Sequence, residues 1–405
     1  MPSLSRFALS AITLFSLGLV ACSEPAEQQP TAESQDAPNE IRIGATMSLS
    51  GTLATQGIAA ANGYRLCEKH INQRGGLLDR PVRFIIHDDR SESETAITLY
   101  EQLIVEEGVD LILGPYGSTL TEAVAPVTER HRKVHISPLA ATSSIWEQGR
   151  EYLFMVLPPA ELFLAGLIDM ADGHGLQTVA VVAEDALFPK AAGDGAAEMA
   201  LTRGMTVPIH ETYTRGDTDF SDLLERIKAE EIDVLAMAAS SLGDFILMVE
   251  QMKALDVNLT MFGTSGAVSQ FAEALGPDAD YAYGLSAWEP GLPNPGIEAF
   301  VEAYQDRFHG EPSFHAAGAY GSCQLLIEAI ERSGSLDDDA LREELLALET
   351  TTIFSHYAVD QRGYQTANRG LFIQWQNGTK VIVWPGDLAT GPANHPAPGW
   401  AERDE

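Results

Sequence analysis

Short apolar runs alternate with longer amphipathic segments along most of the 405-residue chain. In the first third, each run is followed by a segment whose apolar positions recur at helical spacing. Strands are predicted at 40–47, 81–87, 110–114 and 134–136, and helices at 58–74, 93–107 and 121–130. Strands that alternate with helices in this way form a parallel sheet with helices on both faces.

The same alternation returns after residue 160. Strands are predicted at 177–184, 207–213, 233–239, 260–262 and 283–288, and helices at 162–174, 191–203, 220–230 and 243–254. Residues 179–182 are continuously apolar, as a strand covered on both faces requires. The chain therefore contains two successive α/β units of similar size.

The last third of the chain begins with helices and ends with a hairpin. The helices are predicted at 297–308, 316–333 and 339–348. Asn377-Gly378 lies between two apolar runs, a pattern that predicts a hairpin of 371–375 with 380–384.

Two strand ends bring small polar residues to one edge of the first predicted sheet. The strand at 110–114 runs into the loop 116–118, and the strand at 134–136 leads to the loop 140–142. Ligands of open parallel sheets bind at the carboxyl ends of the strands. The hydroxyls and backbone N–H groups of these two loops therefore predict a small-ligand site.

The charge of the chain limits its partners. It carries 25 Lys plus Arg against 58 Asp plus Glu, a net charge of −33. Nucleic acid is not expected as a partner, because phosphate binding depends on a basic patch. We interpret the acidity as a solvation property, with a salt-tolerant source as a hypothesis.

Catalytic and metal-binding motifs are not found in the sequence. Cys22, Cys67 and Cys323 do not form a CxxC or Cys/His pattern with zinc spacing. No Ser/His/Asp arrangement, nucleophile elbow or phosphate loop stands at a convincing spacing either. We expect no metal, no cofactor and no enzymatic activity.

The first 40 residues predict export and anchoring. Residues 1–21 have Arg6 before an apolar run, which is typical of a secretion signal. The run ends Leu19-Val20-Ala21-Cys22, which resembles the lipobox of bacterial lipoproteins with Cys22 as the lipidated residue; the alternative is an ordinary signal with an incidental cysteine. Residues 22–40 contain Pro, Glu and Gln but no large apolar residue, as in a disordered tether. An extracytoplasmic, membrane-anchored protein is expected.

A series of motifs identifies a family. They are SLSGTLATQG at 48–57, INQRGGLLDRPV at 71–82, Asp88-Asp89, GPYGS at 114–118, ISP at 136–138, DTDFSDLLERIKAEEIDV at 217–234 and MFGTSG at 261–266. In this order the chain resembles the leucine/isoleucine/valine-binding family of ABC transporter substrate-binding proteins, which are type I periplasmic binding proteins. The resemblance covers about 41–384.

The resemblance implies an α/β fold with two Rossmann-like lobes joined by a three-segment hinge. One lobe is expected to comprise 41–158 plus 287–355, and the other 159–286 plus 356–390, with 391–405 as a tail. The lobes are expected to close on a small ligand, an amino acid or a related carboxylate or amide. The implied partners are the ligand, ABC permease subunits and the membrane. A sensory protein of the same fold, which signals to a receptor, and a lipoprotein with a dead pocket remain alternatives.

The resemblance also places ligand contacts in the first lobe. Those expected are Gln56, Tyr116, Gly117, Ser118, Ala140, Ala141 and Thr142. The hydroxyl of Ser118 and nearby backbone N–H groups would hold a carboxylate without a buried lysine. Ser118 also suits a helix N-cap, and Gln56 also suits a solvated loop. The threonine of the second loop comes one residue later than in the family, so Ala141 and Thr142 both remain candidates.

In the second lobe the sequence departs from the family. Phe188 stands where the family often has an aromatic residue, although core packing is an alternative. Ser241 and Ser265 replace a common tyrosine and the glutamate that pairs with the ligand ammonium. An ammonium buried without a carboxylate is costly, so either the ligand lacks that group or another acid reaches it. The remaining candidates are Trp288 for stacking and Glu289, Asp185 and Glu184 as acids.

This departure gives the hypothesis that the ligand is not a simple branched-chain amino acid. A separate question concerns Cys67 and Cys323, which lie on predicted helices of the first lobe. In an oxidising compartment they can pair, but buried free thiols are common. The sequence leaves the disulfide open.

Overall fold

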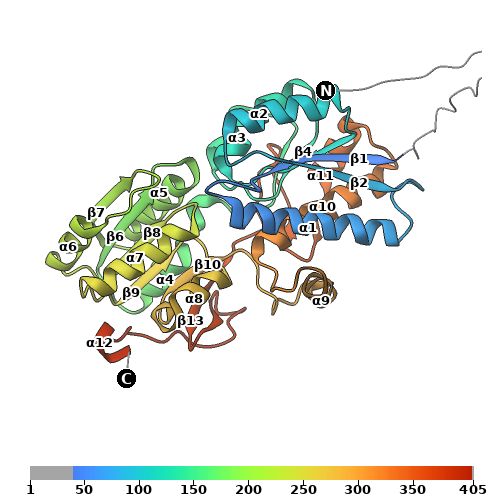
Figure 1. The fold of residues 1–405 in the computed structure, drawn as a ribbon. Coiled ribbons are helices and arrows are strands. Elements are labelled where there is room, and N and C mark those ends of the chain that lie inside the picture. Colours follow the sequence, from blue (N-terminus) through green and yellow to red (C-terminus); the bar gives the residue numbers. More distant parts are fainter. Residues whose placement is uncertain (1–39, 404–405) are drawn as a thin grey trace, which may run out of the picture. The chain divides into compact units, whose positions relative to one another are not determined.

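A computed structural model describes residues 40–403 of the chain (Figure 1). The predicted signal at 1–21, the lipidation site Cys22 and the tether up to residue 39 lie outside the described residues. Residues 404–405 also lie outside them. None of the described helices is both long and apolar enough to span a membrane.

The first sheet contains five parallel strands in the order β2-β1-β3-β4-β5. They are β1 (Ile41–Met47), β2 (Val82–Asp88), β3 (Leu111–Leu113), β4 (His135–Ser137) and β5 (Leu153–Met155). In β3, Leu111 and Leu113 pack into one core, while Ile112 between them packs into another. Successive side chains of a strand point to opposite faces, so both faces of this sheet are covered.

The second sheet contains seven strands in the order β14-β13-β10-β9-β8-β6-β7. They are β6 (Thr178–Glu184), β7 (Thr206–Tyr213), β8 (Val234–Ala238), β9 (Met261–Thr264), β10 (Tyr283–Ser286), β13 (Leu371–Gln376) and β14 (Thr379–Trp384). Strands β6 to β10 are parallel, and the β13–β14 hairpin is antiparallel. A small separate pair joins β11 (Thr350–Thr351) to β12 (His356–Tyr357).

The strand β6 shows why this sheet is buried on both faces. Val179, Val181 and Ala183 pack into one core, and Ala180 and Val182 into the other. A strand with two apolar faces needs helices on both sides. The continuous apolar run therefore correctly predicts that this strand is covered on both faces.

Twelve α-helices are present in the described part of the chain. They are α1 (Ala54–Gln73), α2 (Ser93–Glu101), α3 (Ser118–Arg130), α4 (Ala165–Gly173), α5 (Leu187–Thr202), α6 (Ser221–Ala229), α7 (Leu242–Ala254), α8 (Ser269–Leu275), α9 (Ile297–Phe308), α10 (Phe314–Ser333), α11 (Asp338–Ala347) and α12 (Trp400–Arg403). A π-helix continues α2 over Gln102–Glu106, and 3-10 turns lie at Ser143–Gln148, Ala160–Leu162 and Gly276–Ala279.

The structure corrects several predicted boundaries. Helices α1, α3 and α5 each begin three or four residues earlier than the sequence pattern predicts. The start of α1 was missed because Gly57 resembles a loop residue, whereas it allows close packing: a Cβ there would lie 2.1 Å from the Ser48 carbonyl oxygen. Strand β5 and helix α8 were not predicted. The hairpin turn is confirmed, with positive φ angles at Asn377 and Gly378 that a type I′ turn requires.

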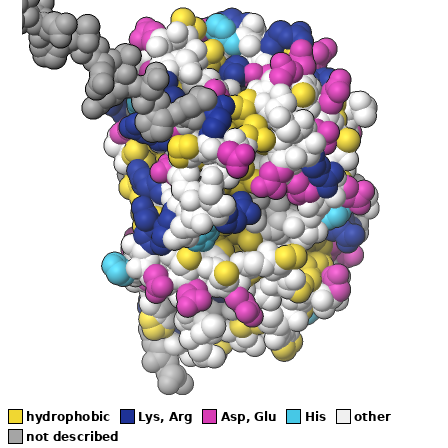
Figure 2. Space-filling view, turned by 90° about the vertical axis from the view of Figure 1, so that its right-hand side faces the viewer, with side chains coloured by type: hydrophobic (Ala, Val, Ile, Leu, Met, Phe, Trp, Pro, Cys, Tyr) yellow, Lys and Arg dark blue, Asp and Glu magenta, His cyan; other side chains and the backbone are white. Residues whose placement is uncertain are grey.

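On the face drawn in Figure 2, acidic side chains are spread out and do not gather in one patch. Figure 2 shows Asp and Glu side chains scattered across one face, with Lys and Arg side chains among them. Many of the basic residues are paired locally, for example Arg150 with Glu122 and Arg226 with Glu211. On this face the negative charge is therefore distributed.

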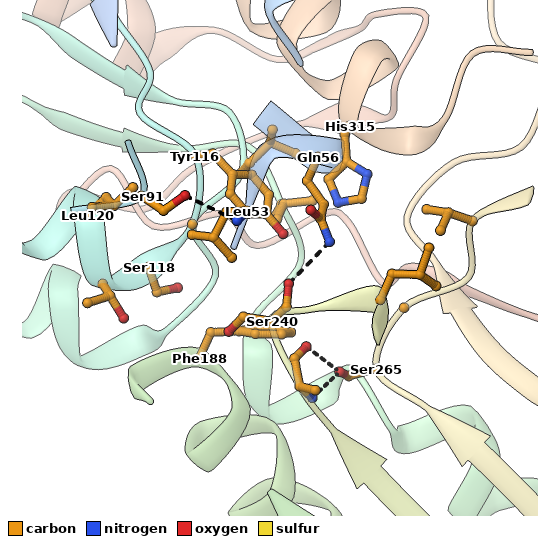
Figure 3. Close-up of a pocket in the computed structure, with 18 of the residues that line it drawn as sticks. Leu53, Gln56, Ser91, Tyr116, Ser118, Leu120, Phe188, Ser240, Ser265 and His315 are labelled. Atoms are coloured by element: carbon orange, nitrogen blue, oxygen red, sulfur yellow. Dashed lines mark hydrogen bonds between the residues drawn. The ribbon is translucent and has the colours of Figure 1, made fainter. Parts of the chain in front are cut away.

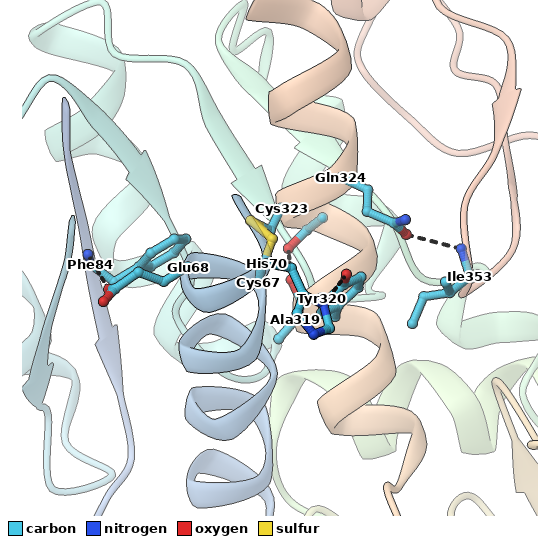
Figure 4. The surroundings of a disulfide bond; sticks show 10 residues. Cys67, Glu68, His70, Phe84, Ala319, Tyr320, Cys323, Gln324 and Ile353 are labelled. Atoms are coloured by element: carbon cyan, nitrogen blue, oxygen red, sulfur yellow. Dashed lines mark hydrogen bonds between the residues drawn. A yellow bond between two sulfur atoms is a disulfide. The ribbon is translucent and has the colours of Figure 1, made fainter. Parts of the chain in front are cut away.

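Helices α1 and α10 lie side by side although about 250 residues separate them in sequence (Figures 1 and 4). A disulfide joins Cys67 of α1 to Cys323 of α10, with their Cα atoms 6.6 Å apart. One turn away, His70 Nδ1 lies 2.8 Å from the Tyr320 hydroxyl. The question that the sequence left open is answered: these two cysteines are bonded, and they fasten the late helix α10 to the first sheet's layer.

We expect the Cys67–Cys323 disulfide to stabilise the fold by about 2–4 kcal/mol, because it closes a very long loop in the unfolded chain. Chemical unfolding of the wild type with and without reductant measures this contribution. The double variant Cys67→Ala/Cys323→Ala serves as the control and should be insensitive to reductant. Equal stability of the wild type in both conditions would contradict the prediction.

Candidate ligand-binding site

A pocket lies where carboxyl-end loops of the two sheets face each other (Figure 3). It encloses about 970 Å³ of space, including the part open to solvent. The first sheet contributes the loop after β3 and the start of α1, and the second contributes the loops after β6, β7, β8 and β9. The start of α10 and residues that follow β2, β4 and β5 also line the pocket. A site of this size between two lobes suits a small organic ligand.

Ser118 is the buried polar residue at the beginning of α3. Gly117 before it has a φ of 81°, which lets the chain turn directly into the helix. Ser118 Oγ accepts hydrogen bonds from the backbone N–H groups of Ala141 and Thr142, at 3.1 and 3.3 Å. Within residues 40–403 it donates no hydrogen bond, so its proton is available to a ligand in the pocket.

The loop 140–142 therefore acts through Ser118. Ala140, Ala141 and Thr142 are buried behind the pocket wall and do not line it. Thr142 Oγ1 has no hydrogen-bond partner in the described chain. The sequence placed these residues beside Ser118 correctly, but their backbone positions the serine hydroxyl instead of lining the cavity.

Gln56 connects the two sheets. Its Nε2 donates a hydrogen bond to the Ser240 carbonyl oxygen at 3.2 Å, across the pocket (Figure 3). Its Oε1 is buried and has no partner among the described residues. A solvated loop residue would have both atoms in water, so the alternative for Gln56 is wrong. The free Oε1 can accept a hydrogen bond from a ligand.

Tyr116 and His315 form an aromatic corner of the pocket. Their rings meet edge-on with centroids 5.4 Å apart, and His315 also stacks on Phe314 at 3.9 Å. Burial lowers the pKa of His315 to about 3, so its imidazole is neutral at neutral pH. Burial also raises the pKa of Tyr116, with the Glu184 carboxylate raising it further and the Arg215 guanidinium lowering it. These two charges therefore act on Tyr116 from the opposite wall.

The second sheet's predicted residues take different roles. Phe188 lines the pocket from the first turn of α5, where its ring meets Phe163 edge-on at 4.9 Å. Ser265 also lines it, but its hydroxyl exchanges hydrogen bonds with the backbone of Ala239. Ser241 does not line the pocket; its Oγ caps α7 by accepting from Gly243 N. Its neighbour Ser240 lines the wall instead.

Trp288 and Glu289 lie away from the pocket. The indole of Trp288 is buried and donates to the Ile353 carbonyl oxygen at 2.8 Å. Glu289 pairs with Lys380 at 2.7 Å. We therefore leave both residues out of the proposed site.

Arg215 was not predicted, and it is the pocket's charged residue. It follows β7 in a polar loop, and its Nε donates to Glu184, which is fully buried at the end of β6. Next to this pair, Tyr213 donates to Asp244 at 2.6 Å. Burial raises the pKa of Asp244, the Tyr213 hydrogen bond lowers it and Glu184 raises it.

Sequence reasoning also missed other pocket residues, and little in the sequence marks them. His315 and Phe314 come from α10, about 200 residues after Ser118, and no local motif identifies them. Phe163 and Phe245 resemble ordinary core residues. No group of three or more His, Cys, Asp or Glu side chains within residues 40–403 is arranged to bind a metal ion.

A sequence profile of the family described as periplasmic binding protein matches residues 40–380. The chain belongs to this family. It is therefore a binding protein, since periplasmic binding proteins are not enzymes. The predicted likeness to leucine/isoleucine/valine-binding proteins is confirmed by a relative from Brucella suis biovar 1 (strain 1330). That relative, Leu/Ile/Val-binding protein homolog 7, is 24% identical, and the match covers 87% of this chain and 94% of the relative.

Solved structures confirm the fold of this periplasmic binding protein. The branched-chain amino acid transporter substrate binding protein LivJ from Streptococcus pneumoniae, solved with isoleucine, matches with a TM-score of 0.75 at 21% identity. The match covers 85% of this chain and all of that one. An ABC transporter solute binding protein from R. palustris, solved with benzoate, matches with a TM-score of 0.76 at 19% identity, covering 88% and 98%.

The neutral, buried state of His315 predicts acid sensitivity. Its folded pKa of about 3 lies below the unfolded value of about 6.5, so its stabilising contribution is complete above pH 6.5 and is lost as the pH falls towards 3. Between pH 7.5 and 5.0 this group alone should remove about 2 kcal/mol from the free energy of unfolding.

Urea unfolding of His315→Gln at the two pH values tests this contribution. The variant's loss of stability between them should be about 2 kcal/mol smaller than that of the wild type. His210→Gln, at an exposed histidine, is the control and should follow the wild type. The same pH dependence in wild type and His315→Gln would show that His315 does not contribute in this way.

Proposed function

We propose that this protein is the solute-binding component of an ABC importer that captures a small organic carboxylate in the pocket between its two sheets. The observation that carries the proposal is the hydroxyl of Ser118. It is buried at the first turn of α3, its lone pairs are occupied by Ala141 N–H and Thr142 N–H, and its proton is left to donate. A donor at a helix N-terminus is suited to an anion.

Ligand capture would work by closing two lobes on the bound molecule. We propose the lobe boundaries given by the family resemblance, 41–158 plus 287–355 and 159–286 plus 356–390. The hydrogen bond from Gln56 to Ser240 joins these proposed lobes beside the pocket. A ligand that contacts both walls adds further bonds of this kind and shifts the population towards the closed form.

Structures of the same fold support a range of carboxylate ligands. Isoleucine and benzoate are bound in the two solved neighbours described above. Both ligands carry a carboxylate attached to an apolar body. The pocket of this chain offers the same two elements: donors around Ser118 and apolar walls that include Leu53, Phe188 and Phe245.

We further propose that the protein is exported and is anchored to the membrane by lipid on Cys22. A flexible segment up to residue 40 would then hold the binding domain within reach of permease subunits. The family supports an extracytoplasmic location, and the sequence Leu19-Val20-Ala21-Cys22 supports the lipid.

Ser118→Ala should weaken ligand binding by about 10- to 100-fold, because a hydrogen bond to a charged group contributes about 1.5–3 kcal/mol. The ligand is first identified by mass spectrometry of protein purified without denaturation, and both proteins are then titrated calorimetrically. Ser221→Ala, on the distant helix α6, is the control and should bind as the wild type does. Unchanged affinity of Ser118→Ala, with the fold checked by circular dichroism, would contradict the proposed role.

Lipid anchoring gives a second prediction. The full chain expressed in a Gram-negative bacterium should fractionate with membranes, whereas Cys22→Ser should lose the acyl chains and the membrane association. Mass spectrometry of the mature N-terminus identifies the modification. Recovery of the wild type without lipid at Cys22 would favour an ordinary signal peptide.

A further inference from the structure

The pocket wall opposite Ser118 carries a positive charge. Arg215 lines the pocket from the loop after β7, and its side chain keeps 37% of its exposure. Its guanidinium has five N–H donors, and only the Nε–H is used in a hydrogen bond within residues 40–403, to Glu184. The outer N–H groups are therefore available to a ligand that covers them.

Glu184 fixes Arg215 and is itself fully engaged. It has no exposure, one of its oxygens accepts from Arg215, and the other accepts from Ser240 N at 2.7 Å. An unpaired buried carboxylate would be costly, so this arrangement holds the guanidinium in place. The pair is an element of the pocket's wall and does not offer a free acid.

The wall lacks a partner for an ammonium group. Among the described residues that line the pocket there is no Asp and no Glu. The three acids that the sequence offered as substitutes are all paired elsewhere: Glu184 with Arg215, Asp185 with Lys190 and Glu289 with Lys380. An α-ammonium would lose its water without gaining a carboxylate, and it would also face the positive charge of Arg215.

The two donor groups lie on either side of the same space. Ser118 lines the pocket from the first turn of α3, and Arg215 lines it from the loop after β7. A carboxylate in this pocket therefore has the Ser118 hydroxyl and the Arg215 guanidinium in the surrounding wall. Apolar side chains form much of the remaining wall, and four of them are aromatic: Phe163, Phe188, Phe245 and Phe314. Edge-on and stacked contacts from such side chains suit a ring or a branched chain.

We infer that the ligand is an ammonium-free carboxylate with an aromatic or branched apolar body, and that Arg215, held by Glu184, selects it over the corresponding amino acid. This inference rests on the proposed solute-binding function and specifies its substrate class. Ser118 donates to one side of the carboxylate and Arg215 to the other. Arg215 is thus a specificity-determining residue, and Glu184 is its positioning residue.

Two pairs of compounds test the inference, because each pair differs only in the α-ammonium group. They are 4-methylpentanoate with leucine, and 3-phenylpropanoate with phenylalanine. Calorimetric titration of the full mature chain should give at least about tenfold tighter binding of the acid in at least one pair. Tighter binding of leucine or phenylalanine would overturn the inference and leave the solute-binding function standing. If none of the four compounds binds, and no compound in a wider panel of amino acids and carboxylates binds either, both the inference and the solute-binding function are overturned.

Variants of the pair assign the selectivity to Arg215. In Arg215→Gln the acid should bind at least about tenfold more weakly, and the freed Glu184 should strengthen amino acid binding, so the preference narrows or reverses. The double variant Glu184→Gln/Arg215→Gln leaves no unpaired charge. In it, binding of the acid should weaken as much as in Arg215→Gln, but binding of the amino acid should not become stronger. Arg226→Gln, at an arginine paired with Glu211 outside the pocket, is the control. An unchanged preference in both Arg215 variants would overturn the role of Arg215.

Discussion

Parallel pairing of strands places every functional loop of this protein at the same edge of its sheet. Strands β1 to β5 all run in one direction, as do β6 to β10, and crossovers connect successive strands within each sheet. Side chains from loops after β3, β6, β7, β8 and β9 consequently meet in a single pocket. Parallel strands need crossover helices, and these helices cover both faces of the sheet. Strands β3 and β6 therefore carry apolar residues on both faces.

Hydrogen-bond donors dominate the polar part of that pocket. Ser118 has its acceptor capacity taken by two backbone N–H groups, and Arg215 can only donate. Glu184 provides the negative charge nearby, but it is buried and satisfied by Arg215 and Ser240. These donors support the proposed anionic ligand end, and the buried Oε1 of Gln56 has no partner among the described residues. The proposed selectivity for a carboxylate thus depends on the pairing of Glu184, which leaves the donors of Ser118 and Arg215 for the ligand.

Much of the fold could be predicted from the sequence, because strand and helix periodicities are local. The buried strand β6 and the Asn377-Gly378 hairpin are clear examples. The first-sheet half of the pocket was also predictable, since Ser118 follows a strand in a recognisable motif. The start of α1 was not, because Gly57 resembles a loop residue, whereas it lies inside the helix and permits close packing against Ser48.

The second wall of the pocket depends on contacts distant in sequence. Arg215 resembles any charged loop residue until β6 and β7 pair and bring it to Glu184. His315 reaches the pocket only because α10 returns to the first sheet, to which the Cys67–Cys323 bond fastens it. Trp288 and Glu289 follow a strand as several pocket-lining residues do, yet their side chains contact Ile353 and Lys380. The local sequence pattern does not predict the direction in which a side chain after a strand points.

The most direct test of the account is a crystal structure of the protein with 3-phenylpropanoate. We expect the carboxylate to lie between Ser118 Oγ and the Arg215 guanidinium, within hydrogen-bonding distance of both, and the phenyl ring to lie among the aromatic side chains of the wall. A carboxylate that contacts neither residue would contradict this expectation.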